Sequence, residues 1–187
     1  MNVIGITGTL GAGKGTIVDY LVQQKGFLHF SARGFLIEEI ERRGLEINRD
    51  SMTFVANDLR SNHSPSYIID QLYDRAVATG KSAVIESVRT LGEIVSLRQK
   101  GNFLLLAIDA DPKIRYERIT ERASETDSIT FETFIANEKR EMTSDDPNKQ
   151  NLERCIREAD FIFTNNGTIN ELNQQVETVL QKVSDGN

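Results

Sequence analysis

The sequence is poor in several residue types that would by themselves define a structural class. It contains one cysteine, three prolines, two histidines and no tryptophan in 187 residues. Cys155 cannot form an internal disulfide and has no metal-binding partner at a useful spacing, so we expect a small, partly buried residue on a helix. The longest purely apolar run, residues 103–108, has six residues, whereas a membrane-spanning helix needs about 20. We therefore expect neither a disulfide framework nor a membrane span.

Positive charge is also scarce. The chain has 22 Lys and Arg against 28 Asp and Glu, a formal net charge of −6, which argues against a polybasic surface for nucleic acid or anionic lipid. Any anionic ligand must therefore be bound by a local group of cations. The first residues lack the basic segment of a signal peptide, and five glycines interrupt them. We expect a cytoplasmic protein with one domain, residues 1–187, and no nucleic-acid or membrane partner.

Short apolar runs alternate with segments of helical periodicity. Buried strands are predicted at residues 2–7, 27–30, 83–85, 103–108 and 161–163. Helices are predicted at residues 15–25, 35–43, 51–59, 66–79, 91–100, 112–121, 131–142, 148–158 and 169–183. This alternation is typical of a parallel sheet covered on both faces. The sequence therefore predicts an α/β fold, a three-layer α/β/α sandwich around a five-stranded parallel sheet.

Two stretches, residues 33–65 and 122–150, are polar and carry little strand signal. Solvated helices and loops would explain both stretches. A pair of mobile covers over a binding site is the alternative. Composition alone leaves both interpretations open.

A glycine-rich segment between the first strand and the first helix carries the strongest functional signal. Residues 8–16 read Gly-Thr-Leu-Gly-Ala-Gly-Lys-Gly-Thr, with the Gly-x4-Gly-Lys spacing of a phosphate-binding loop. Glycines let successive backbone N–H groups converge on phosphate oxygens, and the N-terminus of the next helix adds positive potential. We therefore predict that the phosphates of a nucleotide are bound by Gly8, Leu10, Gly11, Ala12, Gly13, Lys14, Gly15 and Thr16.

Lys14 is the catalytic residue that this loop predicts, bridging the β- and γ-phosphates of ATP. The next position, normally the Ser or Thr that ligates Mg²⁺, is Gly15, with Thr16 after it. We therefore expect Mg²⁺ to be held through water and the phosphates, with Thr16 assisting. Glu86, at the end of a predicted strand, is the preferred acid for orienting the metal's waters. Asp109 is the weaker alternative, because a helix N-cap acid would explain its position.

The loop, with Gly15-Thr16 after the lysine, resembles that of nucleoside monophosphate kinases of the adenylate kinase type. Most of the chain is similar to small kinases related to adenylate, deoxynucleoside monophosphate and dephospho-coenzyme A kinases. The segments that carry this similarity are residues 87–93, 112–118, 138–141 and 159–168. The resemblance implies a P-loop NTPase fold of the nucleoside monophosphate kinase type, with an acceptor-binding segment near residues 33–75 and a lid near 118–147. It also implies an enzyme that uses ATP and Mg²⁺ and a small-molecule nucleotide acceptor.

Such an enzyme brings two polyanions together, so it needs several cations around the transferred group. Arginine suits this role because its planar fork binds phosphate through two hydrogen bonds and stays charged. Arg89 directly follows the strand of Glu86, and we predict that it binds the acceptor phosphate and acts in catalysis. Arg60 and Arg33 are further predicted substrate ligands. Surface ion pairs are the alternative explanation for all three arginines.

Two more arginines, Arg118 and Arg122, lie at helical spacing where the lid segment begins. The resemblance implies that they close over the phosphates as catalytic residues; pairing with glutamates on a solvated helix face is the alternative. The resemblance also places Asn166 and Gly167, after the last strand, along the adenine of ATP. A helix-entry turn capped by Thr168 would explain the same residues.

The predicted reaction moves the γ-phosphoryl group of ATP to a nucleoside or deoxynucleoside monophosphate, giving the diphosphate and ADP. An acceptor phosphate is already ionised near neutral pH and needs no general base. In dephospho-coenzyme A kinases the acceptor is a hydroxyl, and an Asp shortly after the second strand is the expected base; residues 27–37 contain no Asp or Glu. Dephospho-coenzyme A kinase remains an alternative, as does a regulatory nucleotide-binding protein with little transferase activity.

Overall fold

Strands and helices alternate along the chain as the sequence predicts. The computed structural model describes residues 2–122 and 129–185. Its strands are β1 (Val3–Gly8), β2 (Leu28–Ser31), β3 (Ala83–Glu86), β4 (Phe103–Asp109) and β5 (Phe161–Thr164). They form one parallel sheet in the order β2-β3-β1-β4-β5. The predicted α/β fold with a five-stranded parallel sheet is confirmed.

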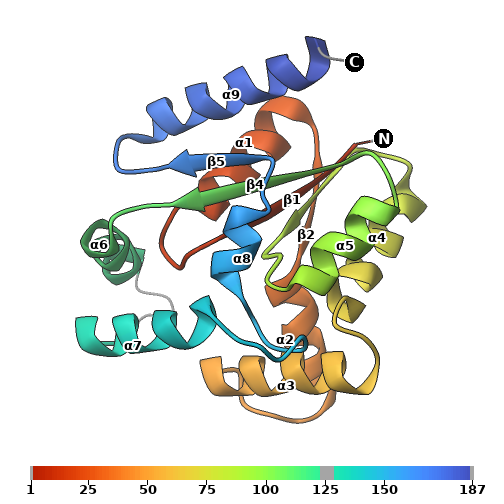
Figure 1. Ribbon diagram of the computed structural model, residues 1–187, viewed down its shortest axis with the longest axis vertical. Helices are drawn as coiled ribbons and strands as arrows, with labels where there is room; N and C mark the ends of the chain where they lie inside the picture. Colours follow the sequence, from red (N-terminus) through yellow and green to blue (C-terminus); the bar gives the residue numbers. More distant parts are fainter. Residues whose placement is uncertain (1, 123–128, 186–187) are drawn as a thin grey trace.

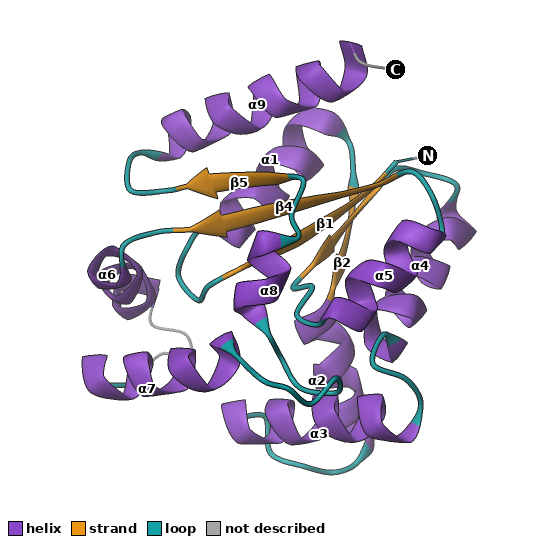
Figure 2. Cartoon of the chain, in the orientation of Figure 1, coloured by secondary structure: helices purple, strands orange, loops and turns teal. Residues whose placement is uncertain are grey.

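Helices cover both faces of this sheet. They are α1 (Lys14–Lys25), α2 (Ala32–Arg42), α3 (Arg49–Asn62), α4 (Tyr67–Thr79), α5 (Leu91–Gln99), α6 (Pro112–Arg122), α7 (Phe131–Met142), α8 (Leu152–Arg157) and α9 (Ile169–Asp185). Helices α1 and α9 lie on one face, and α4, α5 and α8 lie on the other (Figure 1). The separation of strands and helices into three layers is also visible when the chain is coloured by secondary structure (Figure 2).

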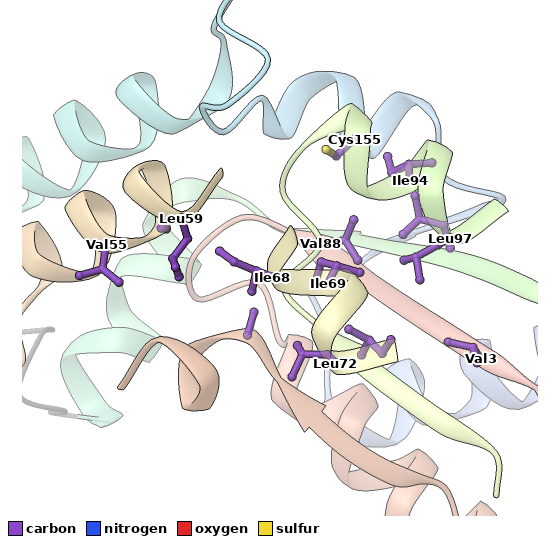
Figure 3. Packing of buried hydrophobic residues seen from close by; sticks show 14 of the residues in the cluster. Val3, Val55, Leu59, Ile68, Ile69, Leu72, Val88, Ile94, Leu97 and Cys155 are labelled. Atoms are coloured by element: carbon purple, nitrogen blue, oxygen red, sulfur yellow. The ribbon is translucent and has the colours of Figure 1, made fainter. Parts of the chain in front are cut away.

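The alternation of side chains along each strand builds two hydrophobic cores. In β4, Leu105 packs into the core beneath α4 and α5, whereas Leu106 and Ile108 pack into the core beneath α1 and α9. Figure 3 shows the first core, in which Ile69 from α4 and Ile94 from α5 lie among the buried residues. Burial on both faces explains why these strands read as continuous apolar runs in the sequence.

Side-chain caps set three helix boundaries that differ from the expected ones. Helix α2 begins at Ala32, three residues before the expected start, because the Ser31 hydroxyl accepts a hydrogen bond from the Gly34 N–H. Asn48 caps α3 in the same way and starts it at Arg49. Asn151 caps α8, which therefore begins at Leu152 rather than at residue 148. A capping residue can therefore start a helix before or after the point that the apolar periodicity indicates.

The structure bears on two expectations, one about the single cysteine and one about membrane-spanning helices. Cys155 lies on α8 as expected, but it is fully buried, and burial raises the pKa of its thiol to about 12. Within residues 2–122 and 129–185, no helix has the length and apolar character needed to cross a membrane.

The elements that frame the functional site gather at the carboxyl ends of the strands. Helices α2 and α3 belong to the expected acceptor-binding segment, and α6 and α7 lie beyond the end of β4 (Figure 1). Residues 123–128 of the expected lid segment lie outside the described residues. Ligands of open parallel sheets bind at this carboxyl edge, so the fold positions the candidate site there.

Candidate active site

The loop between β1 and α1 folds closely around its neighbours. Gly8 and Gly13 have positive φ angles of 141° and 110°. A Cβ atom at Gly8 would lie 2.0 Å from the carbonyl oxygen of Ile108, so only glycine lets the chain pass this near β4. Gly13 is the N-cap of α1 and supplies no capping side chain. The N–H groups of the first helical turn therefore remain available to an anion.

A cleft of about 880 Å³ lies beside this loop. Most of the predicted phosphate ligands line it: Leu10, Gly11, Gly13, Lys14, Gly15 and Thr16. Gly8 and Ala12 are not among the lining residues that the structure describes. Gly8 ends β1, and the Ala12 side chain is fully buried in the core beneath α1.

The Lys14 side chain folds back onto its own loop. Its Nζ atom donates hydrogen bonds to the carbonyl oxygens of Gly8, at 2.9 Å, and of Thr9, at 2.8 Å. Burial, followed by the positive charge of Arg89, lowers the pKa of Lys14 to about 7, although the negative charges of Glu86 and Glu141 oppose this shift. A bound phosphate would supply a negatively charged partner for the Lys14 ammonium group, which contacts only neutral carbonyl oxygens in these two hydrogen bonds.

Two side chains, one at the end of β4 and one directly after β5, hold the loop in place. The Thr9 hydroxyl donates a hydrogen bond of 2.6 Å to the Asp109 carboxylate, and the Asn165 side-chain amide donates one of 2.8 Å to the Ala12 carbonyl. Asp109 therefore contacts the loop through Thr9 rather than lining the cleft. It is Asp111, at the start of α6, that accepts a hydrogen bond from the first helical turn, through the Lys113 N–H at 2.8 Å.

Glu86 and Thr16, the two predicted metal-binding residues, both line the cleft. The Glu86 carboxylate forms a hydrogen bond of 3.0 Å with His29 Nε2. Burial opposes ionisation of Glu86, but the hydrogen bond with His29 and the charge of Lys14 outweigh it, so the pKa of this carboxyl lies below its usual value. A carboxylate and a hydroxyl are hard oxygen donors that suit Mg²⁺. The residues present therefore fit a Mg²⁺ ion that arrives with nucleotide phosphates.

A strained turn brings Arg89 to the cleft. Ser87, directly after β3, has a positive φ of 77°, which is unusual for a residue other than glycine. The N–H groups of Ser87 and Val88 both donate to the Ile6 carbonyl at 2.9 Å, which holds this turn against β1. Arg89 then follows at the carboxyl edge of the sheet and lines the cleft. Strain of this kind concentrates at functional sites.

Arg60 and Arg33, the other predicted substrate ligands, also line the cleft but differ in their contacts. Arg60 is buried and donates from Nε and Nη2 to one oxygen of the fully buried Glu93, at 3.3 and 2.9 Å. This ion pair holds the Arg60 side chain in one position. Arg33 is more exposed, and its Nη1 lies 3.3 Å from the Met52 sulfur.

Three residues that the sequence did not indicate also line the cleft: Arg49, Glu141 and Gln150. Glu141, from α7, forms ion pairs with Arg49 and with Arg89, the latter at 3.3 Å. Gln150 accepts a hydrogen bond of 2.7 Å from Arg89. These residues come from three separate segments, so no local spacing in the sequence indicates that they meet.

The two arginines of the predicted lid segment occupy different places. Arg122 lines the cleft. Arg118 also lines it, but its guanidinium donates to the carbonyl oxygens of Asn165, at 2.9 Å, and Gly167, at 3.3 Å. Arg118 thus links α6 to the loop after β5.

That loop was predicted to contact the adenine through Asn166 and Gly167. Gly167 lines the cleft, together with Asn165 and Ile169. The Asn166 side chain instead accepts a hydrogen bond of 2.8 Å from the Asp111 N–H, and it is not among the described lining residues. The Ile169 side chain is 64% exposed and gives this end of the cleft an apolar surface.

Positive charge is concentrated in the cleft although the chain as a whole is acidic. Among the described residues, seven Lys or Arg side chains line it, against four Asp or Glu: Lys14, Arg33, Arg49, Arg60, Arg89, Arg118 and Arg122 against Asp19, Glu86, Glu121 and Glu141. A chain with an overall charge of −6 can bind an anionic ligand only where cations gather locally, and this cleft is such a place. The arrangement can hold the phosphates of a nucleotide and a second anion beside them.

The phosphate-binding loop and the sheet order define a nucleotide-binding P-loop domain with a kinase-like fold. The chain belongs to the AAA domain family, whose sequence profile matches residues 4–144. It is 29% identical over 182 residues to a UPF0200 protein of Pyrobaculum aerophilum, and the alignment covers 96% of this chain and 97% of that protein.

Solved structures share the architecture. A shikimate kinase from Bacteroides thetaiotaomicron superposes with a TM-score of 0.60 at 14% identity, covering 96% of this chain and 98% of the kinase. A dephospho-CoA kinase from Campylobacter jejuni superposes with a TM-score of 0.52 at 17% identity, covering 97% of each chain. At these identities the likeness concerns the fold alone.

Proposed function

We propose that this protein is an ATP-dependent phosphotransferase that moves the γ-phosphoryl group of ATP to a nucleoside or deoxynucleoside monophosphate. The observation that carries the proposal is that Lys14, on the phosphate-binding loop, and Arg89, in the turn after the neighbouring strand β3, line the same cleft. One cation from each side can therefore act on the same transferred group.

The donor nucleotide would bind at the loop end of the cleft. Backbone N–H groups of the loop and of the first turn of α1 would bind its phosphates, and Lys14 would move from the Gly8 and Thr9 carbonyls to the phosphate oxygens. The exposed Ile169 side chain and Gly167 offer an apolar surface for the base. Mg²⁺, held through Glu86, Thr16 and the phosphates, would neutralise charge on the transferred group.

The acceptor would bind between α2, α3 and the turn after β3. Arg89 would bind its phosphate group, and Arg33 and Arg60 are further candidates on the same side of the cleft. Because the acceptor oxygen belongs to an ionised phosphate, these residues need only position it and neutralise its charge. Transfer then requires no general base from the protein.

A panel of acceptors tests the proposal. Ribo- and deoxyribonucleoside monophosphates, dephospho-coenzyme A and shikimate would each be offered with ATP and Mg²⁺, and acceptor-dependent ADP formation would be measured. We expect formation with one or more monophosphates. Activity confined to hydroxyl acceptors would contradict the proposed acceptor class, and ATP binding without acceptor-dependent ADP formation would identify a regulatory protein instead.

A further inference from the structure

The acceptor side of the cleft contains a carboxylate where a substrate anion would be expected. Glu141, near the end of α7, forms ion pairs with Arg49 at the start of α3 and with Arg89 after β3. Its side chain is only 11% exposed. Helix α3, helix α7 and the turn after β3 therefore meet at one carboxylate, and this carboxylate lies inside the cleft where we propose that the substrate binds.

Within the part of the chain that the structure describes, two arginines that line the cleft keep hydrogen-bond donors without a partner even though Glu141 is present. Among the described residues, Arg49 Nε and Arg60 Nη1 are buried donors without a hydrogen-bond partner. Arg60 is 4% exposed, and Glu93 already binds two of its three guanidinium nitrogens. Buried donors without partners are costly, so their presence in two cleft-lining arginines indicates that an acceptor of hydrogen bonds is missing.

We propose that Arg49 is a further ligand for the anionic group of the acceptor, and that Glu141 occupies the position of this group until the acceptor displaces it. The proposal rests on the proposed function and specifies it: the acceptor carries a phosphate. A carboxylate offers two oxygens and one negative charge to Arg49 and Arg89. A phosphate monoester offers three oxygens and nearly two negative charges, which match two arginine forks better.

The competition between Glu141 and phosphate gives the proposal a signature that a purely structural ion pair lacks. Removing the charge of Glu141 should destabilise the empty protein, because it leaves two partly buried arginines without their counter-ion. The same change should strengthen phosphate binding, because the anion no longer has to displace a carboxylate. A residue that only holds α7 in place would cause the first effect and not the second.

Inorganic phosphate is the probe for a direct test. The protein would be saturated with ADP and Mg²⁺, so that the phosphate-binding loop is occupied. Its thermal unfolding would then be followed against phosphate concentration at constant ionic strength, which yields an apparent dissociation constant. The variants are Glu141→Gln, Glu141→Asp and Arg49→Gln. Glu153→Gln is the matched control, since Glu153 pairs only with the exposed Arg157 among the described residues.

We expect Glu141→Gln to lower the dissociation constant for phosphate about ten-fold, the size of one charge-assisted contact, and Arg49→Gln to raise it about ten-fold. Glu141→Asp, which retracts the carboxylate, should fall between wild type and Glu141→Gln. Glu153→Gln should match wild type. A dissociation constant within about two-fold of wild type in Glu141→Gln, or in Glu141→Asp if the first variant does not fold, would overturn the proposal, as would the same result in Arg49→Gln.

The test also separates this inference from the proposed function. If no acceptor on the panel receives phosphoryl while the variants shift phosphate binding as expected, the proposed reaction is wrong and the anion site stands. If transfer occurs but the variants change neither phosphate affinity nor the Michaelis constant of the acceptor, the reaction stands and the role of Arg49 and Glu141 is wrong.

Discussion

The guanidinium of Arg115, on α6, donates a hydrogen bond of 3.3 Å to the carbonyl oxygen of Leu10 in the phosphate-binding loop. Arg115 is 2% exposed and is also ion-paired with Glu138 on α7. One helical turn further along α7, Glu141 contacts Arg49 and Arg89. Helix α7 is thus connected to the phosphate-binding loop through one glutamate and to the arginines of the proposed acceptor site through another.

The buried position of Arg115 makes it a stability determinant. We expect Arg115→Met to lower the free energy of unfolding by roughly 3 kcal/mol or more, because it leaves Glu138 without its counter-ion and the Leu10 and Ala110 carbonyls without a donor. Urea denaturation measures this loss.

Arg157→Met is the control for that loss, because Arg157 forms an exposed ion pair of the kind worth about 0.5 kcal/mol or less. The double variant Arg115→Met/Glu138→Leu should recover part of the lost stability. Equal losses in Arg115→Met and Arg157→Met would show that the buried contact carries no special weight.

The lowered pKa of Lys14 predicts proton uptake when a nucleotide binds. With a pKa of about 7, Lys14 is largely neutral in the empty protein at pH 8, and bound phosphates should raise its pKa and protonate it. Binding then takes up a proton, and ADP affinity should fall as the pH rises above 7, by up to about ten-fold per pH unit. Calorimetry in buffers of different ionisation enthalpy measures the uptake at pH 8, where the phosphates are already ionised.

Lys14→Arg provides the control for this measurement, because arginine remains charged at every pH in that range. It should bind ADP with little proton uptake. Equal uptake in wild type and Lys14→Arg would assign the proton to another group.

Two glycines of the loop should respond oppositely to the same substitution. Gly8→Ala places a Cβ 2.0 Å from the Ile108 carbonyl at a positive φ, whereas a Cβ at Gly15 meets nothing within 4 Å and φ there lies outside the left-handed region. We expect Gly8→Ala to destabilise the protein by about 2 kcal/mol or more. Gly15→Ala should stabilise it by up to about 1 kcal/mol, because alanine favours the helix. Denaturant midpoints of the two variants test the contrast, and similar changes in both would contradict the loop geometry.

Features that depend on local sequence could be predicted here, and features that depend on distant partners could not. The strands follow from apolar runs, and the phosphate-binding loop follows from the spacing of Gly8, Gly13 and Lys14. The start of α2 was misplaced although its signal, Ser31 before the helix, is present in the sequence. Arg49 and Glu141 were missed because they lie 92 residues apart and meet only through the fold.

The same limit applies to the loop after β5. Its place beside the donor site was expected by resemblance, but which asparagine faces the cleft depends on rotation of the backbone. The structure places Asn165 in the lining, with its side chain on the Ala12 carbonyl, and Asn166 on the Asp111 N–H. Such orientations are set by contacts that a single sequence does not contain.

Lys14 is proposed to serve phosphoryl transfer between two nucleotides in this cleft. The most direct test of this role follows the labelled γ-phosphoryl group of ATP into each nucleoside monophosphate. Wild type and Lys14→Ala are compared at a temperature at which thermal unfolding shows both to be folded. Wild type should form labelled diphosphate, and Lys14→Ala should form almost none, because the transition-state charge loses its main neutralising group. Transfer by Lys14→Ala within a few-fold of wild type, or no transfer to any monophosphate by wild type, would contradict the account.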